Sequence, residues 1–251
     1  MDILLLRLDA PLMSFGAPIV DRHGVIQPYP ALSMMTGLLG NALGVDHSEP
    51  ERLQRLQERL RYAVRQDRRG QQLRDYQTVD LSKPYLDDAR AWTTRHTLEQ
   101  RKGGSASSGT HIRLRDYHAD ACYTVALTLD SAEENPTVAD CASALKQPAR
   151  PLFIGRKTCL PAGPLFIDRI TADSLLTALR NAPPAARSRS STHRAWWPTT
   201  PDRPRLTTDG VSEDTRYPVT DRRDWKNQIH VGERWLAEGN LTLETNSPTH
   251  A

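Results

Sequence analysis

Three histidines lie close to basic residues in the middle of the chain. They are His96, His111 and His118, and Lys102 and Arg113 lie among them. Cleavage of RNA without a metal needs a base that activates the 2′-hydroxyl and cations that stabilise the phosphorane charge. Imidazole and basic side chains supply both, so a metal-independent ribonuclease is one hypothesis. The alternative is a non-catalytic RNA-binding loop within which these rings stack or form hydrogen bonds, and no carboxylate stands at helical spacing to orient His111 or His118.

The residues from Arg90 to Arg115 carry a local excess of positive charge. The stretch holds six Lys and Arg residues against one acid, Glu99, whereas the whole chain has a net charge of only +3. Such a cluster attracts polyanions, including nucleic acids. A solvated, charged loop is the alternative that charge alone leaves open.

A small hydroxyl, an aromatic ring and a glycine stand where an apolar strand leads into a helix. These residues are Ser14, Phe15 and Gly16, and the helix is predicted over 32–44 with Ser33 as its N-cap. The free N–H groups at the helix start, including that of Met34, favour an anion, as does the helix dipole. The pattern predicts a surface for a phosphate or a base. An ordinary connection with a buried Phe15 is the alternative.

A second candidate phosphate site follows Gly155, where Arg156 and Lys157 place two cations beside a permissive backbone. A turn with a solvated basic pair is the alternative. The sequence has no G-x-x-x-x-G-K-[ST] pattern, which argues against a nucleotide P-loop. It also has no H-x-x-x-H, G-x-S-x-G or D-x-D pattern, so we expect no metal and no cofactor.

The predicted elements would bring these segments together on one sheet. Strands are expected over 3–8, 61–67, 122–129 and 163–170, and helices over 32–44, from Pro50, over 135–148 and over 173–182. This order predicts an α+β protein with a ferredoxin-like (RRM-like) antiparallel sheet and helices on one face. The Gly/Ser-rich run 102–110 predicts the tip of a long protruding thumb hairpin over about 78–115.

Composition sets the domain organisation and the compartment. We expect one domain over 1–180, and an irregular, Pro-, Ser-, Thr- and Arg-rich extension over 181–251 that packs on it. The chain has no apolar run of membrane-spanning length, and its start does not read as a secretory signal. Its three cysteines are widely spaced, which suits a reduced cytosol and argues against a disulfide framework or a zinc site. These features predict a cytoplasmic protein.

Five segments in order carry a family resemblance. They are "LRLDAPLMSFGAP", "YPALSMMTGLLGNALG", "LRDYQTV", "RDYHADACYTVAL" and "RPLFIGRKTCLPAGPLF", and the resemblance that they carry extends over about residues 3–170. In this combination the chain resembles the CasD-type subunits of type I-E CRISPR Cascade complexes, which belong to the RAMP superfamily.

The resemblance implies a binding role rather than catalysis. Such a subunit would cap the 5′ handle of the CRISPR guide RNA and contact a CasC-type backbone subunit and a CasA-type large subunit, with target DNA nearby and no membrane. In a related subtype the equivalent protein is itself the nuclease. A metal-independent endoribonuclease that processes CRISPR repeat RNA is therefore the alternative function.

The resemblance and the charge pattern together assign the RNA-binding residues. The family's small-aromatic-Gly turn, its Arg-Asp-Tyr run and its basic pair after Gly match positions in this chain. The expected RNA-binding residues are Ser14, Phe15, Gly16, Arg22, Ser33, Met34, Arg74, Tyr76, Arg95, His96, Lys102, His111, Arg113, Arg115, Gly155, Arg156 and Lys157.

Overall fold

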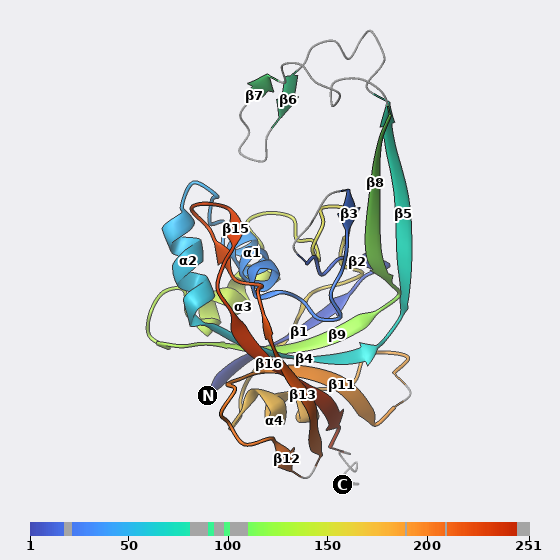
Figure 1. Cartoon of the computed structure of the whole chain (residues 1–251). Helices are drawn as coiled ribbons and strands as arrows, with labels where there is room; N and C mark the ends of the chain where they lie inside the picture. The colour runs from blue at the N-terminus through green and yellow to red at the C-terminus, as the bar shows by residue number, and fades with distance from the viewer. Residues whose placement is uncertain are drawn as a thin grey trace.

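An eight-stranded sheet forms the base of the computed structural model, and every pair of neighbouring strands in it is antiparallel (Figure 1). The structure describes residues 1–17, 22–80, 90–92, 98–100, 110–188, 190–208 and 210–244. The strand order is β10-β1-β9-β4-β11-β16-β13-β12. The strands are β1 (Asp2–Asp9), β4 (Leu60–Arg68), β9 (Cys122–Leu129), β10 (Phe166–Thr171), β11 (Thr192–Thr199), β12 (Thr207–Thr208), β13 (Val211–Val219) and β16 (Arg234–Thr242).

The C-terminal part of the chain extends this sheet. The four strands predicted from the first 170 residues are present as β1, β4, β9 and β10. The prediction that 181–251 is irregular is wrong, because β11 pairs with β4, and β16 and β13 follow it in the sheet. These strands are held by pairing with residues far away in the sequence. Their own Pro- and Arg-rich composition gives no local pattern that would predict a strand. The boundary near residue 181 stays a prediction.

Helices cover both faces of the sheet rather than one. The described helices are α1 (Leu32–Ala42), α2 (Pro50–Arg59), α3 (Val138–Lys146) and α4 (Leu175–Asn181). The first three lie on one side, and α4 lies on the other (Figure 1). The expectation of helices on one face is therefore corrected. The strand β1 is apolar on both faces, because Leu4 and Leu6 belong to the hydrophobic cluster on the α1 side while Ile3 and Leu5 belong to the cluster on the α4 side. Both faces of the sheet therefore need a covering helix.

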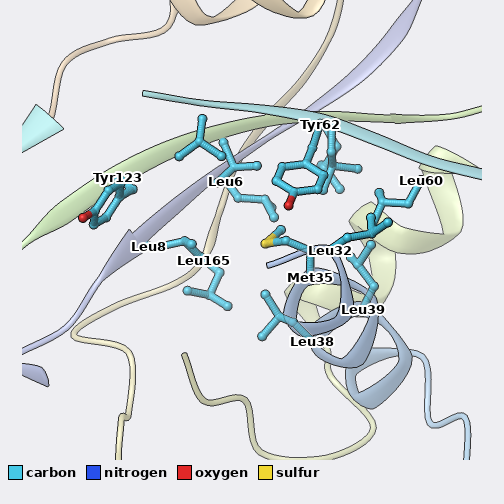
Figure 2. Packing of buried hydrophobic residues seen from close by; sticks show 14 of the residues in the cluster. Leu6, Leu8, Leu32, Met35, Leu38, Leu39, Leu60, Tyr62, Tyr123 and Leu165 are labelled. Carbon is cyan, nitrogen blue, oxygen red and sulfur yellow. The ribbon is translucent and has the colours of Figure 1, made fainter. Parts of the chain in front are cut away.

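The larger core lies between the sheet and α1. Met35 of this helix points toward Leu6 and Tyr62 of the sheet (Figure 2), and Leu38 and Leu39 belong to the same buried cluster. All five side chains are buried, and the three from the helix follow the i, i+3, i+4 spacing of one helix face. This packing fixes the helix across β1 and β4. None of the described helices is long and apolar enough to cross a membrane.

A two-stranded hairpin rises from the sheet beside β9 (Figure 1). It consists of β5 (Gln71–Asp80) and β8 (Thr110–Ala119), which pair from Gln71↔Ala119 to Asp80↔Thr110. The predicted thumb hairpin therefore begins earlier than residue 78. Residues 81–89, 93–97 and 101–109 lie outside the described residues. The short strands are β2 (Leu12–Met13), β3 (His23–Gly24), β6 (Arg90–Trp92), β7 (Leu98–Gln100), β14 (Arg223–Asp224) and β15 (Ile229–His230).

Burial makes the stability of this fold depend on pH. It lowers the pKa of His118, His193 and His230 below the ordinary value. The unfolded chain takes up these protons as the pH falls through about 6.5, while the folded chain resists protonation until a lower pH. Since the unfolded state then binds more protons, the free energy of unfolding falls as the pH drops below about 6.5.

We expect urea midpoints to decrease from about pH 7.5 to about pH 5.5. His118→Gln should weaken this dependence, because its amide can still donate a hydrogen bond to the Gln27 carbonyl as the His118 Nε2–H does but does not titrate. A free energy of unfolding that stays constant over this range would contradict the expectation.

Candidate nucleic-acid interface

Several chain segments meet at the foot of the hairpin. Met13 of β2 pairs with His118 of β8, and β3 pairs with β8 farther along. The Ser14 N–H donates to the Ile154 carbonyl at 3.1 Å, which joins the loop before α1 to the loop that contains Gly155. The segments that the resemblance selects are therefore neighbours in space.

Asp116 is the buried centre of this junction. Its side chain is 3% exposed, and its carboxylate accepts from Arg74 Nε at 2.8 Å and lies 2.9 Å from His23 Nε2. The hydrogen bond from Arg74, and then that from His23, holds the pKa of Asp116 below its usual value. The Asp116 carbonyl accepts from Arg156 Nη1 at 2.9 Å. One residue thus ties β3, β5 and the 155–157 loop to β8.

The two faces of the hairpin differ because side chains alternate along a strand. Gln72, Arg74 and Tyr76 share one face of β5. On β8 the same face carries His118, opposite Gln72, and Asp116, opposite Arg74 and hydrogen-bonded to it. We call this the Tyr76 face. Tyr76 is 61% exposed, so its ring presents a surface on which a base can stack.

The opposite face is basic. Arg113, Arg115 and Tyr117 lie on it by alternation, and the Arg156 guanidinium sits 4.6 Å from the centre of the Tyr117 ring. Gly24 of β3 also faces this side, since a Cβ there would lie 2.8 Å from Arg156 Nη2 and 3.1 Å from Arg115 Cδ. The absence of a side chain at Gly24 lets the two guanidinium groups approach each other.

We call five cations at this place the basic cluster. Its members are Arg22, Arg113, Arg115, Arg156 and Lys157. Arg115 Nη1 donates to the Arg22 carbonyl at 3.3 Å, which holds the start of β3 against β8. Among the described residues of this hairpin face, Asp75 is the acidic one, and its carboxylate accepts from Gln77. The cluster therefore keeps an excess of positive charge.

Close packing requires a glycine at position 155. Its φ is +94°, and a Cβ at this position would lie 1.8 Å from the Ser14 carbonyl oxygen. This close approach brings the 155–157 loop against the Ser14 segment. Both were predicted to bind RNA, and the structure places them together.

The side chains of Ser14 and Phe15 lie inside the protein. Ser14 is 2% exposed, and the fully buried Phe15 ring packs 5.2 Å from His118 and 5.0 Å from Tyr123, measured between ring centres. A buried ring presents no face to a base, so the expectation that Phe15 binds RNA through its ring is corrected. Gly16 is exposed next to them.

The start of α1 is already occupied by the chain's own carboxylate. The N-cap is Ala31 rather than Ser33. The Leu32 N–H donates to Asp221 Oδ2 at 2.9 Å, and the Ser33 N–H donates to the Asp221 carbonyl at 3.0 Å. The side chain and the carbonyl of Asp221 therefore lie at the predicted phosphate position beside Ser33. No local sequence signal shows this, because Asp221 is far away in the chain.

Other predicted residues lie outside what the structure describes. Arg95, His96 and Lys102 lie outside the described residues, and so does the side chain of His111. His118 is described, and its Nε2–H donates to the Gln27 carbonyl at 2.7 Å.

Two features at this junction were not predicted from the sequence. One is His23, whose orienting carboxylate Asp116 comes from another strand. The other is a cavity of about 550 Å³ where β4 turns into β5, which we call the foot pocket. Its lining residues are Pro28, Gln66, Arg69, Gly70, Gln71, Gln72, His118, Arg194 and Trp196. The polar run "RRGQQ" at the β4–β5 turn was the available signal.

The fold is shared with solved CRISPR-associated proteins. A chain of a "CRISPR RNA-guided surveillance complex" matches with a TM-score of 0.64 and 25% identity over 97% of this chain and 91% of that one. A structure described as "Crystal structure of Cas protein" matches with a TM-score of 0.59 and 23% identity over 96% and 95%.

Sequence comparison is more specific. The family described as "CRISPR-associated protein (Cas_Cas5)" matches residues 3–237, so the chain belongs to the Cas5 family. The "CRISPR system Cascade subunit CasD" of Escherichia coli (strain K12) is 30% identical over 189 residues, which cover 72% of this chain and 77% of that protein. The resemblance seen in the sequence is confirmed.

Arg156 and Lys157, which the sequence presents as a pair, should behave differently on substitution. Arg156→Ala removes hydrogen bonds to the Asp116 and Gly24 carbonyls and the packing against Tyr117. We expect it to lower the free energy of unfolding by about 2–4 kcal/mol. Lys157 is exposed, so Lys157→Ala should stay within about 0.5 kcal/mol. Urea denaturation of both variants checks this, and equal stabilities would show that Arg156 is not structural.

Proposed function

We propose that this chain is a non-catalytic, RNA-binding subunit of a CRISPR surveillance complex that caps the 5′ handle of the guide RNA. The observation that carries the proposal is the basic cluster at the foot of the hairpin. Lys and Arg side chains there neutralise phosphates and release counterions, which supplies affinity for a single strand. Family membership and the likeness to a surveillance-complex chain support the same role.

The cluster divides into cations that hold the fold and cations that remain at the surface. Arg156 is partly buried and donates to two main-chain carbonyls. Arg113 and Lys157 are exposed, and Arg22 is exposed at the start of β3. These exposed cations are the ones we expect at the phosphates, together with Arg115, while Gly16 leaves room for the RNA backbone beside them.

The finer assignments follow from the same proposal. The partial order β10-β1-β9-β4, with helices in both crossovers, supports a ferredoxin-like core for the first part of the chain. Its partners would be a CasC-type backbone subunit and a CasA-type large subunit, with target DNA nearby, in the cytoplasm. The relative's name, a Cascade subunit, supports these partners.

Removing exposed charge should weaken RNA binding and its dependence on salt. The double variant Arg113→Ala, Lys157→Ala should bind repeat-derived 5′-handle RNA more weakly. The slope of log affinity against log salt should fall by about 0.7 for each phosphate that the variant no longer neutralises. Fluorescence anisotropy over a salt series measures both quantities.

The matched control removes two exposed arginines from elsewhere on the protein. Arg52 and Arg61 each pair with one acid, Glu49 and Asp130 respectively. The variant Arg52→Ala, Arg61→Ala should keep the wild-type affinity and slope. Equal losses in both double variants, or equal affinity of the wild type for handle and scrambled RNA, would reduce the chain to a nonspecific polyanion binder.

The His23–Asp116 pair favours a second candidate function, a metal-independent endoribonuclease. A carboxylate that orients an imidazole is the arrangement of a general base. The His23 side chain is 32% exposed, but it meets Asp116 on the Tyr76 face, which is opposite to the basic cluster. Against this function, Asp116 also binds Arg74, so its charge is shared with a second cation.

A cleavage assay separates the two functions. Incubation of the chain with unprocessed repeat RNA in EDTA should leave the RNA intact if the protein is a cap. A nuclease would produce a 2′,3′-cyclic phosphate, and His23→Ala would lower its rate by about 10²–10⁴ while RNA still bound. Cleavage at one site that His23→Ala abolishes would replace the binding proposal by the enzymatic one.

A further inference from the structure

The foot pocket is a polar cavity without a carboxylate in its described lining. Its side chains are three glutamines, two arginines, a histidine, a proline and a tryptophan. Trp196 is 3% exposed and contributes apolar surface together with Pro28. The volume of about 550 Å³ lies in the range of small-ligand sites. The lining thus offers hydrogen-bond donors and acceptors beside a patch of apolar surface.

The interior of this pocket is close to neutral. The Arg194 guanidinium donates to Glu238 at 2.6 Å and also to Asp214, so its charge is compensated. His118 donates its Nε2–H to the Gln27 carbonyl, and burial lowers its pKa, so its imidazole is neutral near pH 7. A neutral, flat ligand with a hydrogen-bonding edge fits this interior better than an ion does.

One uncompensated cation stands at the edge of the pocket in the described structure. Arg69 is exposed and precedes Gly70 in the turn between β4 and β5. Gly70 has a φ of +65°, and a Cβ there would lie 2.3 Å from the Ala119 carbonyl oxygen. The turn is therefore fixed in a conformation that glycine favours. This fixes the main-chain position of Arg69 at the edge of the neutral pocket.

The Tyr76 face continues from the pocket. Gln72 lines the pocket, and Arg74 and the exposed Tyr76 follow it at every second residue of β5. A neutral hydrogen-bonding pocket, a cation and an exposed aromatic ring in a row are the elements with which proteins hold splayed single-stranded bases.

We propose that the foot pocket holds one unstacked nucleobase of the bound RNA. Gln72 contacts the edge of this base, Arg69 contacts its phosphate, and the ring of Tyr76 stacks on a neighbouring base. The proposal rests on the RNA-binding function proposed above and adds a base-reading site to it.

The test compares two exposed glutamines on opposite faces of β5. Gln72→Ala removes an amide from the pocket, and Gln77→Ala removes one from the basic side, where it only donates to Asp75. The probes are repeat-derived 5′-handle RNA and a series in which each nucleotide in turn is abasic. Binding is measured by anisotropy with the full chain.

We expect one abasic position to weaken wild-type binding about tenfold, the contribution of one amide–base pair. Gln72→Ala should weaken binding of the intact RNA by about the same factor and should be insensitive to that abasic position. Its salt dependence should be unchanged, because no charge is removed. Gln77→Ala should behave as the wild type, and Tyr76→Ala should weaken binding at a neighbouring position.

Two outcomes overturn the inference alone. If the wild type prefers handle RNA but Gln72→Ala binds every probe as Gln77→Ala does, the pocket holds no base. If Gln72→Ala weakens assembly with neighbouring subunits and leaves RNA binding intact, the pocket receives protein. A wild type that does not distinguish handle from scrambled RNA overturns the proposed function and the base-reading site with it.

Discussion

The candidate interface depends on Asp116. A buried carboxylate is stable only where cationic or hydrogen-bonding groups meet it, and here Arg74 and His23 do so from two different strands. Its carbonyl binds Arg156, so the side chain anchors the Tyr76 face while the main chain anchors the basic face. Arg74 and Arg156 are consequently committed in part to the fold. This is why residues that look like an RNA-binding set in sequence divide into structural and surface cations.

The same principle explains the start of α1. A helix N-terminus attracts an anion, which is why a phosphate was predicted there, but the group at this position is Asp221 of the chain itself. Arg234 pairs with Asp221 and also donates to the Tyr62 hydroxyl, so the last strand of the sheet is tied to the helix through this carboxylate. Because Asp221 is part of the chain, this position is always occupied. The carboxylate therefore fixes β16 against the start of α1.

The sequence predicted what is local and failed where distant segments decide. Strands β1 and β9 and helix α2 follow from apolar periodicity, and Pro50 marks the start of the last of these. Strands β11, β13 and β16 were missed because their pairing partners supply the reason for their conformation. The aromatic Phe15 was placed at the surface because its burial depends on His118 and Tyr123, about a hundred residues later. The foot pocket and the His23–Asp116 pair were missed for the same reason, since each joins residues from separate strands.

In the function proposed above, the two faces of the hairpin would provide different components of recognition. Cations on the basic face would act on phosphates, which every RNA sequence offers equally, so they would supply affinity and register but no preference for a base. The neutral amides of the foot pocket and the ring of Tyr76 would act on bases, which differ in their hydrogen-bonding edges. A strand places these functions on opposite sides by alternation alone, without any additional element. In that proposal, one stretch of RNA would meet the phosphate-binding cations and another the base-binding groups, and Asp116 keeps the two faces in a fixed relation through its side chain and its carbonyl.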